Sequence, residues 1–537
     1  MIAIMKKLAA AAIALFTIAA VAQAEDTERY LIATRQPFHA GAVERVLSDE
    51  GLPQRNVDGF ESFNGFAADL TKTELYQVSR NANVRWIEPE LERHAYAQAP
   101  RNLHGQTIPY GIDMIHAREA AVAPHNATTN VVVIDTGVDY THPELRAIYA
   151  GGYNFIAKTD DPLDDGSHGT HVAGTIAAAN NDAGVVGVAP DVRLWALKVL
   201  NSSGSGSNSN VIKAFDWIIA KKKERGGNWI ANLSLGASDP SNAEREAVNR
   251  AIAAGILIVA ASGNESTSTV AAPVGYPAAY DGVIAVGAID DAESLATFSN
   301  QGPELDVVAP GVDVLSTLPV GTGSIAWLES GANTYAAAAL TGAKRGTITG
   351  AYVYCGLGKP EEIPASVAGK IALIKRGELT FADKAKNAKL AGAIAVAIFN
   401  NDLSAMNWTL LGSTDPVANT YDWPVTIGIS KADGDLLAAR NSGTITVANE
   451  ADDYGVYSGT SMASPHVAGA AAFLWSAAPA ATANDIAAAL TQTATDLGLP
   501  GFDTGYGWGI VNVLAGVQRL APSSIPPVNG KRRRSVR

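Results

Sequence analysis

The sequence contains a single cysteine, Cys355, among 537 residues, so no disulfide bond can form within the chain. No motif of a catalytic cysteine surrounds it, and we interpret Cys355 as a structural or free thiol. Stability must therefore come from burial of apolar side chains and from any bound ions.

Charge is also scarce, since only 17% of the residues are charged, whereas 47% are apolar and 51 are glycines. This composition excludes disorder for most of the chain and is typical of a large, loop-rich globular protein. The length predicts two to four domains. The net charge of −13 argues against nucleic acid as a general partner.

Long apolar runs are absent except at the N-terminus. Lys6 and Lys7 precede an apolar stretch over residues 8–21, and Ala22-Gln23-Ala24 follows the small-x-small cleavage rule. The stretch is short for a membrane anchor, and two acidic residues follow it. We therefore expect a signal peptide over residues 1–24, an exported soluble protein with no membrane span, and a bacterial source. Met5 is an alternative start.

Residues 29–94 predict a small α+β unit. Strands are expected at 29–33, 63–70 and 84–89 and helices at 41–49 and 73–80, and with a turn inside 63–70 the order β-α-β-β-α-β indicates a ferredoxin-like fold. An exposed linker of small residues, 95–100, offers a place for a proteolytic cut.

From about residue 106, buried strands alternate with helices. Strands are expected at 130–135, 192–200, 229–235, 256–261 and 283–287, and helices at 168–179, 209–225 and 242–254. This alternation predicts a doubly wound, mostly parallel α/β sheet, whose sites lie at the carboxyl ends of the strands.

The alternation stops near residue 318 and resumes at residue 454. The stretch between predicts a β-rich inserted domain with strands at 347–353, 370–374, 394–399 and 425–429 and a helix at 381–391. After residue 454 the α/β pattern continues through 484–493 and 510–520. The tail ends in Lys531-Arg532-Arg533-Arg534, which is a solvated tail, an anchor to an anionic surface, or a segment trimmed on maturation.

Three segments at strand or helix ends carry the residue types that acyl transfer needs. Asp135 ends a buried strand, His168 opens a helix, and Ser461 precedes a helical run over 462–475 with Pro465 in its first turn. Taken singly, each is most simply a cap or a structural residue. Asn264, after another buried strand, offers a carboxamide donor for an oxyanion.

Joined in the order Asp, His, Asn, Ser, these motifs resemble those of the subtilisin-like serine proteases, for which this order of the triad is known. The resemblance covers residues 106–318 and 454–520. Residues 29–90 resemble the family's inhibitory propeptide, and the insert resembles a protease-associated domain, notably over 381–393. The resemblance thus implies these domain boundaries: a propeptide at 25–98, a catalytic domain at 99–318 and 454–522, an insert at 319–453, and a basic tail at 523–537.

The resemblance implies that Ser461 is the nucleophile, that His168 is the general base and then acid, and that Asp135 orients His168. Asn264 and the Ser461 N–H group would hold the oxyanion. His171, His466 and Asp139 would be structural.

The resemblance also implies how a peptide substrate is held. An edge strand would pair with its backbone, and a second segment would line the other side. A pocket with a glycine at its base would accept a large apolar or aromatic residue before the scissile bond. Asn208 lies where relatives often carry an aromatic lid, so selectivity further along the peptide would be loose. The edge strand would be Ser205, Gly206 and Ser207, and the second segment would be Ser234, Leu235 and Gly236. The pocket would be lined by Ala261, Gly263 and Gly275.

A structural Ca²⁺ ion is a further implication, since the expected ligands are all oxygen atoms. They belong to side chains of Gln106, Glu144 and Asn181 and to the carbonyls of Ala179, Ala183 and Val185. The family usually carries aspartate at the position of Glu144. Without the resemblance, residues 179–185 are an ordinary polar loop.

Three functions remain open from the sequence. The first is a secreted serine endopeptidase made as a zymogen, which acts on protein or peptide substrates and is inhibited by its own propeptide until a cut near residues 96–99. The second is a binding protein that keeps the fold without turnover, and the third is a ligase or cyclase. The insert either filters large substrates or is a passive spacer, and its two ends should lie close together.

Overall fold

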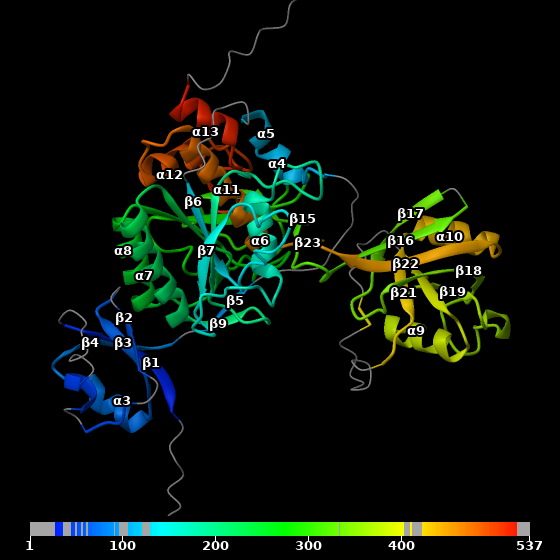
Figure 1. Cartoon of the computed structure of the whole chain (residues 1–537), viewed down its shortest axis with the longest axis horizontal. Helices are drawn as coiled ribbons and strands as arrows, with labels where there is room; N and C mark the ends of the chain where they lie inside the picture. The colour runs from blue at the N-terminus through cyan, green and yellow to red at the C-terminus, as the bar shows by residue number, and fades with distance from the viewer. Residues whose placement is uncertain are drawn as a thin grey trace, which may run out of the picture. The chain divides into compact units, whose positions relative to one another are not determined.

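The computed structural model describes residues 27–35, 44–48, 51–54, 57–60, 63–90, 92–95, 106–120, 129–331, 333–401, 409–410 and 421–522. The chain forms two compact units, residues 1–90 and 91–537. The expected signal peptide, cut region and basic tail lie outside the described residues. Figure 1 shows the elements by label and by their order in the chain.

The N-terminal unit contains a four-stranded sheet in the order β2-β3-β1-β4. β1 (Glu28–Thr34) lies between β3 (Gly65–Leu70) and β4 (Val84–Pro89) and pairs antiparallel with both, which confirms the ferredoxin-like arrangement. β2 (Asp58–Phe60) is the edge strand, and α3 (Lys72–Ser79) starts with a capping box at Thr71.

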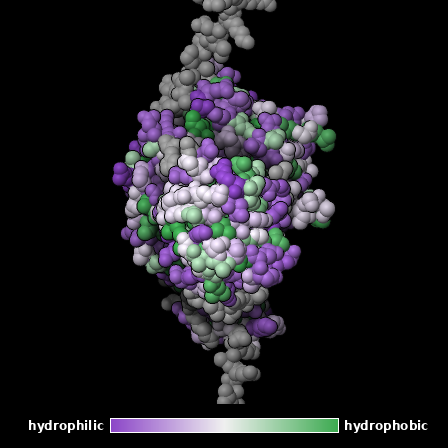
Figure 2. All heavy atoms as spheres, turned by 90° about the vertical axis from the view of Figure 1, so that its right-hand side faces the viewer, coloured by the Kyte–Doolittle hydropathy of each residue, from purple (hydrophilic) through white to green (hydrophobic). Residues whose placement is uncertain are grey.

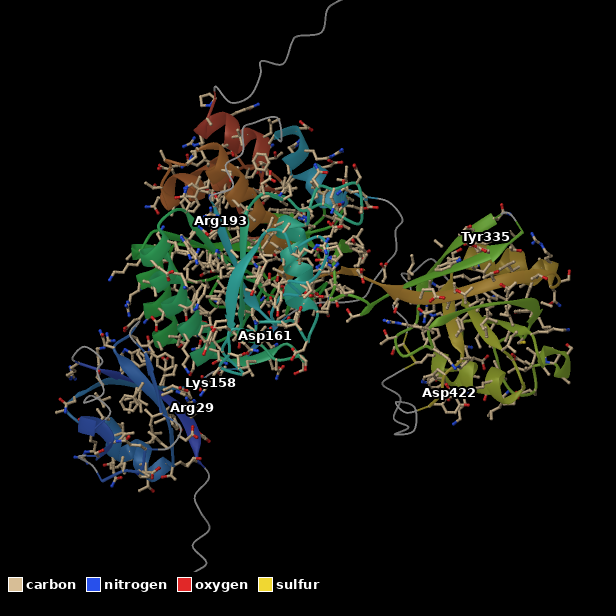
Figure 3. The ribbon with its side chains drawn as sticks, viewed as in Figure 1. Arg29, Lys158, Asp161, Arg193, Tyr335 and Asp422 are labelled. Atoms are coloured by element: carbon tan, nitrogen blue, oxygen red, sulfur yellow. The ribbon has the colours of Figure 1, made fainter. Side chains whose placement is uncertain are left out.

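Two local details differ from the expectation. The strand expected from residue 63 starts at Gly65 instead, because Asn64 lies in a turn with a positive φ of 54°. A π-helical turn, Glu44–Ser48, occupies the described part of the first expected helix. Arg29, labelled in Figure 3, makes ion pairs with Asp58, Asp69 and Glu90 within this unit.

The larger unit is built on a seven-stranded parallel sheet in the order β14-β13-β12-β10-β6-β8-β7. The apolar runs of the sequence form its central strands, which are buried along their whole length, as strands covered on both faces should be. The strands are β6 (Asn130–Asp135), β7 (Tyr149–Asn154), β8 (Arg193–Lys198), β10 (Trp229–Leu233), β12 (Ile256–Ala261), β13 (Val283–Ile289) and β14 (Val307–Pro310).

The strand order reverses at β6. The chain passes from β6 to the edge strand β7, returns to place β8 between them, and later fills the other side with β10, β12, β13 and β14. Asp135 is the last residue of β6, so it lies at the point where ligands of open α/β sheets bind. The doubly wound sheet is therefore confirmed.

Helices cover the sheet. α6 (His168–Ala177) packs against α11 (Thr460–Ala477), and α11 also contacts β10, β12, β13 and β14. α7 (Asn208–Arg225) and α8 (Asn242–Ala253) pack together, and Figure 1 shows them on the left of the strands with α6 on the right. The other α-helices of this unit outside the insert are, among the described residues, α4 (Tyr110–Met114), α5 (Ala117–Ala120), α12 (Ala483–Gln492) and α13 (Val513–Leu520).

The strand expected over residues 229–235 divides in two. β10 ends at Leu233, and β11 (Leu235–Gly236) joins a separate three-stranded antiparallel sheet in the order β11-β5-β9. Its other members are β5 (Glu92–Ala95) and β9 (Ser205–Ser207). Residue 95, expected to begin a linker, is therefore the end of a paired strand.

The insert forms a closed barrel in the order β16-β17-β21-β20-β19-β18-β22. In its described part, seven strands and two α-helices enclose two apolar clusters, as expected for a domain with its own core. The strands are β16 (Gly323–Ser330), β17 (Asn333–Ala339), β18 (Gly346–Tyr354), β19 (Ile371–Lys375), β20 (Ala395–Phe399), β21 (Val425–Ile429) and β22 (Thr444–Asp452), and the helices are α9 (Phe381–Leu390) and α10 (Lys431–Arg440).

The two ends of the insert lie side by side, as expected. β15 (Val314–Thr317) enters the insert and β23 (Tyr454–Tyr457) leaves it, and the two strands pair antiparallel with Thr317 opposite Tyr454. The Leu318 N–H group donates to the Asp453 carbonyl oxygen at 2.7 Å, which closes this ribbon.

None of the helices among the described residues combines the length and the apolar character needed to cross a bilayer. Figure 2 shows a face on which hydrophilic side chains surround a central area of neutral and hydrophobic ones. Leu390 and Leu436, both in the insert, are among the exposed large apolar residues.

Candidate active site

Asp135 and His168 form a buried pair at the carboxyl end of the parallel sheet. Asp135 ends β6 and is fully buried, while His168 opens α6 and is 5% exposed. His168 Nδ1 lies 2.7 Å from Asp135 Oδ1, an oxygen that also accepts from the Thr136 N–H group at 2.7 Å. Because Nδ1 faces Asp135, Nε2 is the ring nitrogen directed away from that carboxylate.

The turn before His168 is organised by a second carboxylate, Asp164. It accepts hydrogen bonds from Thr136 Oγ1, from Thr170 Oγ1 and from the N–H groups of residues 166, 167 and 170. Burial raises the pKa of Asp164 despite these bonds. The network joins β6, which carries Asp135, to the first turn of α6, and so fixes the two elements of the pair.

Close backbone packing also positions His168. Ser167 has a left-handed backbone with φ of 76°, and Gly169 has no room for a side chain because a Cβ atom there would lie 2.0 Å from the Gly137 carbonyl oxygen. The sequence Ser-His-Gly thus lets α6 start directly against the end of β6.

Ser461 is the second residue of α11 and is fully buried. Its Oγ donates to the Ser234 carbonyl oxygen at 3.0 Å, and within the described residues no hydrogen bond joins it to His168. The expectation that Pro465 falls in the first turn of this helix is wrong. The helix begins at Thr460, so Pro465 is its sixth residue and lies inside it.

Asn264 is held by the residue that precedes Ser461. Its Oδ1 accepts from both the N–H group and the Oγ1 of Thr460, each at 2.9 Å, and Thr460 Oγ1 accepts from the Gly263 N–H group at 3.2 Å. Because Oδ1 is engaged, Nδ2 is the remaining donor of the Asn264 amide. This orientation places a carboxamide donor at the helix N-terminus that carries Ser461.

The segments expected to hold a peptide backbone form the outer strands of the sheet β11-β5-β9. Leu235 and Gly236 pair with Ala95 and His94, while Ser205, Gly206 and Ser207 pair with residues 94, 93 and 92 on the other side. Ser234 lies between β10 and β11. An extended segment of this chain therefore occupies the position between the two expected walls.

The residues expected to form the pocket also lie together. The Gly275 N–H group donates to the Ser262 carbonyl oxygen at 2.8 Å, between Ala261 and Gly263, and Tyr276 pairs with Ala237 beyond β11. Gly263 has φ of 109°, and a Cβ atom there would meet the Asn300 amide at 2.4 Å, so glycine is required.

His171 and His466 are fully buried, and burial lowers the pKa of His171 to about 3 and that of His466 to about 4. His171 stacks on Tyr457, and Nδ1 of His466 lies 2.8 Å from the Met462 carbonyl oxygen. Both are neutral at ordinary pH, as structural residues. Asp139 accepts bonds from Thr141 and from the Val320 N–H group, which lower its pKa although burial alone would raise it.

The residues expected to bind Ca²⁺ lie around one loop. Gln106 Nε2 donates to the Ala179 carbonyl oxygen and Asn181 Nδ2 donates to Glu144 Oε2, each at 3.0 Å. Tyr454, in β23, donates from its hydroxyl to Glu144 Oε1 at 2.9 Å. In the same loop, the Ala183 N–H group donates to Asn181 Oδ1, and Val185 bridges to Thr107.

The chemistry of this loop fits a hard cation. Glu144 is almost fully buried, and burial raises its pKa. The surrounding donors are amide and backbone oxygens, the ligands that Ca²⁺ takes. Across the described residues no group of three or more His, Cys, Asp or Glu side chains could hold a metal, so amide and backbone oxygens would have to supply most of the ligands here.

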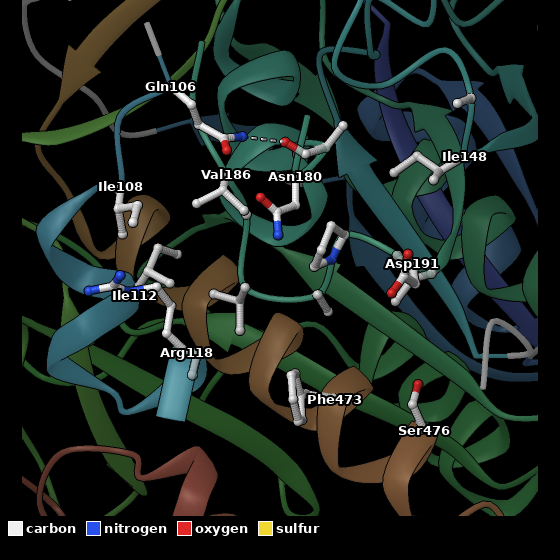
Figure 4. A pocket seen from close by; sticks show the side chains of 18 residues that line it. Gln106, Ile108, Ile112, Arg118, Ile148, Asn180, Val186, Asp191, Phe473 and Ser476 are labelled. Carbon is white, nitrogen blue, oxygen red and sulfur yellow. Dashed lines mark hydrogen bonds between the residues drawn. The ribbon is translucent and has the colours of Figure 1, made fainter. Parts of the chain in front are cut away.

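A cavity of about 560 Å³ lies beside the loop (Figure 4). Gln106, Ala179 and Asn180 line one part of it, and Phe473 and Ser476 of α11 line another. Asp135, His168, Asn264 and Ser461 are not among its lining residues, so the cavity is separate from the candidate catalytic groups.

Sequence reasoning missed the residues that hold the site together. Thr460 and Asp164 stand close to Ser461 and His168 in sequence, and their hydrogen-bonding side chains were the available signal. Asn232 is the polar residue in the buried strand Trp-Ile-Ala-Asn-Leu, a position where an unpaired amide would be costly.

Comparison with known proteins gives consistent matches. A sequence profile described as the Subtilase family matches residues 126–365, and one described as the PA domain matches residues 332–437. The chain is 38% identical to Subtilisin E of Bacillus subtilis (strain 168) over 308 residues, which cover 56% of this chain and 76% of that protein.

Two further proteins of the same kind are similar to this chain. A Thermostable alkaline protease of Halalkalibacterium halodurans is 39% identical over 309 residues, or 56% of this chain and 77% of that protein. The crystal structure of the psychrophilic subtilisin-like protease Apa1 from the Antarctic psychrotroph Pseudoalteromonas sp. AS-11 matches with a TM-score of 0.56 and 30% identity. That match covers 79% of this chain and all of the other.

Proposed function

Because the chain belongs to the subtilase family and is a serine endopeptidase, we propose that it cuts peptide bonds through Asp135, His168 and Ser461, with Asn264 as oxyanion donor. The observation that carries the proposal is the buried Asp135–His168 pair, 2.7 Å apart, at the sheet end where Ser461 and the paired strand β5 also lie.

In the proposed reaction, Ser461 Oγ attacks the carbonyl carbon of the scissile bond and its proton passes to His168 Nε2. Asp135 accepts the Nδ1–H group and so stabilises the imidazolium. The intermediate collapses as His168 gives that proton to the leaving amine. Water then repeats the sequence on the acyl group. In the structure the Ser461 hydroxyl faces the Ser234 carbonyl, so it must first turn to His168, as often happens when substrate binds.

The oxyanion formed on attack would receive hydrogen bonds from Asn264 Nδ2 and from the Ser461 N–H group. Two features support this: Thr460 fixes the Asn264 amide, and the first N–H groups of a helix have no partner within it.

We also propose that the chain is made as a zymogen and that residues 25–98 inhibit it. Support comes from β5, which lies as the middle strand between β9 and β11, where a substrate backbone would lie. An inhibitor that follows the substrate path blocks the site until it is cut and removed.

The register of β5 suggests the cut. β5 ends at Ala95, which is opposite Leu235, and Leu235 directly follows Ser234, whose carbonyl contacts the nucleophile. Residues 96–100 lie outside the described residues, and we propose that the cut falls near residues 96–99.

We propose a preference for large apolar or aromatic residues before the scissile bond. Gly275 supports it because its missing side chain leaves room beside the Ala237 carbonyl oxygen, 3.1 Å from where a Cβ atom would be.

A structural Ca²⁺ ion is proposed at Glu144, Asn181 and Gln106, with the carbonyls of the 179–185 loop. The ion would supply a positive charge that offsets the buried carboxylate and would hold the loop, and it takes no part in the reaction.

Export through residues 1–24 and the domain limits given above are also proposed. They are supported by the signal-like N-terminal sequence and by the closed barrel that lies within residues 319–453.

The decisive experiment compares the full chain with its Ser461→Ala variant, by mass, N-terminal sequence and casein cleavage. The unchanged chain should lose its first segment and cleave casein, and Ser461→Ala should do neither. Ser476→Ala, a buried serine at the far end of the same helix, is the control and should behave like the unchanged chain. If the unchanged chain stays full length and inactive, the protease proposal fails.

Specificity needs a separate experiment with peptides that vary at the residue before the cut. We expect the highest kcat/KM for Phe, Tyr and Leu. A strong preference for Arg or Asp would contradict the assignment of Gly275 to the pocket.

A further inference from the structure

Pro465 leaves a gap in the hydrogen bonding of the nucleophile's own helix. In an α-helix the carbonyl of residue i accepts from the N–H group of residue i+4. The partner of the Ser461 carbonyl would be residue 465, which is proline and has no N–H group. Ser461 is fully buried, so its carbonyl needs another donor.

Ser234 supplies that donor. Its Oγ donates to the Ser461 carbonyl oxygen at 2.7 Å, and its own carbonyl oxygen accepts from Ser461 Oγ at 3.0 Å. Ser234 thus contacts both the backbone and the hydroxyl of the nucleophile. Because Ser234 directly precedes β11, the same residue ties Ser461 to a wall of the substrate path.

Asn232 determines the direction in which the Ser234 hydroxyl points. A serine hydroxyl has one hydrogen to donate. Asn232 Nδ2 donates to Ser234 Oγ at 3.0 Å, so the Ser234 hydrogen is directed to the Ser461 carbonyl. Ser464 Oγ donates to Asn232 Oδ1 at 2.8 Å, which fixes the orientation of the amide. All four residues are fully buried.

We propose that Asn232 is a positioning residue for the nucleophile. Its amide orders the chain of hydrogen bonds from Ser464 through Asn232 and Ser234 to Ser461, and this chain replaces the helical bond that Pro465 removes. Asn232 touches neither substrate nor reacting atoms, and it acts through Ser234. The proposal rests on the assignment of Ser461 as the nucleophile.

The first test measures kcat and KM of Asn232→Ala on a peptide substrate. A displacement of about 1 Å can cost roughly 100-fold in rate, so we expect kcat to fall roughly 10- to 100-fold with KM nearly unchanged. The rate at which a fluorophosphonate labels Ser461 should fall in parallel. An unchanged kcat in a folded variant would overturn the proposal.

Asn130→Ala is the matched control. Asn130 is also a buried asparagine, on the neighbouring strand β6, and its amide bonds Trp195 and Asn228 at the amino end of the sheet. This variant should lower Tm without changing kcat. If both variants change Tm and kcat alike, the role of Asn232 is only structural.

The pH profile of Asn232→Asp tests the direction in which the hydrogen bonds from Asn232 to Ser461 run. An ionised carboxylate accepts from Ser234 Oγ and turns its hydrogen away from Ser461, whereas the protonated acid can donate as the amide does. The ratio of the variant's kcat to that of the unchanged enzyme should therefore rise as the pH falls. A ratio that is constant with pH contradicts this mechanism.

Pro465→Ala provides an independent test because it restores the N–H group at residue 465. Ser234→Ala should reduce kcat strongly in the unchanged chain and less in the Pro465→Ala background. If Ser234→Ala reduces kcat by the same factor in both backgrounds, the role given to Pro465 is overturned. Failure of the unchanged enzyme to react with the fluorophosphonate would instead refute the proposed function, so the two failures are distinguishable.

Discussion

At the scale of single residues, hydrogen bonds from neighbours hold each proposed reactive group. Thr460 orients Asn264, Asp164 organises the turn before His168, and Ser234 contacts Ser461 twice. Substitution of such a neighbour should therefore displace a reactive group without removing it.

Asn264→Ala should reduce kcat by about 100- to 1,000-fold, a loss known from removal of one oxyanion donor in subtilisin itself. KM should change little, because the bond is strongest when the oxyanion forms. Steady-state kinetics on a peptide substrate measure both constants. Thr460→Val, which removes one of the two bonds to Asn264 Oδ1, should give a smaller loss, and an unchanged kcat in Asn264→Ala would exclude Asn264 as a donor.

Asp306→Asn should stabilise the protein at neutral and alkaline pH. Burial raises the pKa of Asp306 to about 6, above its ordinary value, so the stability linked to this group is complete below about pH 4 and is lost as the pH rises through 6. Asparagine stays neutral and can still accept from the Ala285 N–H group. We expect a gain of about 1–3 kcal/mol at pH 8.

Unfolding of Asp306→Asn should be measured in the Ser461→Ala background, which prevents self-digestion. The gain should disappear at pH 4. An equal gain at both pH values would show that it does not arise from the ionisation of Asp306.

The proposed catalytic groups could be chosen from sequence because each lies in a short motif at the end of a strand or the start of a helix. The supporting roles of Asn232 and Thr460 could not be predicted, since their partners are remote in sequence. Asn232 meets Ser464 across 232 positions, and Thr460 meets Asn264 across 196. Such pairings follow from the fold and leave no local pattern.

At the scale of elements, apolar runs predicted the central strands, because burial on both faces requires them. β7 was missed, since Tyr-Ala-Gly-Gly-Tyr-Asn has no β-branched residue and lies at the edge of the sheet. β9 and β11 are short and pair through β5, so neither carries a strand pattern of its own.

The loop over residues 179–185 should be the element most sensitive to chelators. EDTA should lower Tm of the Ser461→Ala protein, because the burial of Glu144 would then lack a cation. Glu144→Gln should remove most of the EDTA effect, and Glu119→Gln, at an exposed position, should keep it. Equal Tm values with and without chelator would contradict the proposed site.

At the scale of the whole molecule, acid should destabilise the fold before it protonates most carboxylates. Burial lowers the pKa of His171 to about 3 and of His466 to about 4, below the ordinary value for histidine. Their contribution to stability is present above pH 6.5 and is lost as the pH falls towards 4, by up to about 1.4 kcal/mol per pH unit for each histidine.

Tm of the Ser461→Ala protein between pH 7.5 and 4.5 tests this expectation. The two histidines should leave Tm nearly unchanged down to about pH 6.5 and lower it as the pH falls further. His116→Gln, at an exposed histidine, should leave the slope unchanged. A Tm that stays constant over this range would show that the two buried histidines are not protonated on unfolding.

The insert should be removable, because Thr317 and Tyr454 are paired and the Gly321 N–H group donates to Asp453 Oδ1 at 2.7 Å. Replacement of residues 322–452 by two glycines should leave the catalytic domain folded and active on short peptides. Unchanged casein cleavage would identify the insert as a spacer, whereas faster cleavage would identify it as a filter. Loss of peptide cleavage would show that the fold needs the insert.

The closed ribbon of β15 and β23 also bears on how such a chain could arise. A hairpin turn and a whole domain can occupy this position with the same separation between their ends, so neither the sheet nor the helices need to adjust. A single recombination event at this joint could therefore add or remove the domain without an unfolded intermediate in the lineage. The ancestry of the barrel can accordingly differ from that of the catalytic sheet around it.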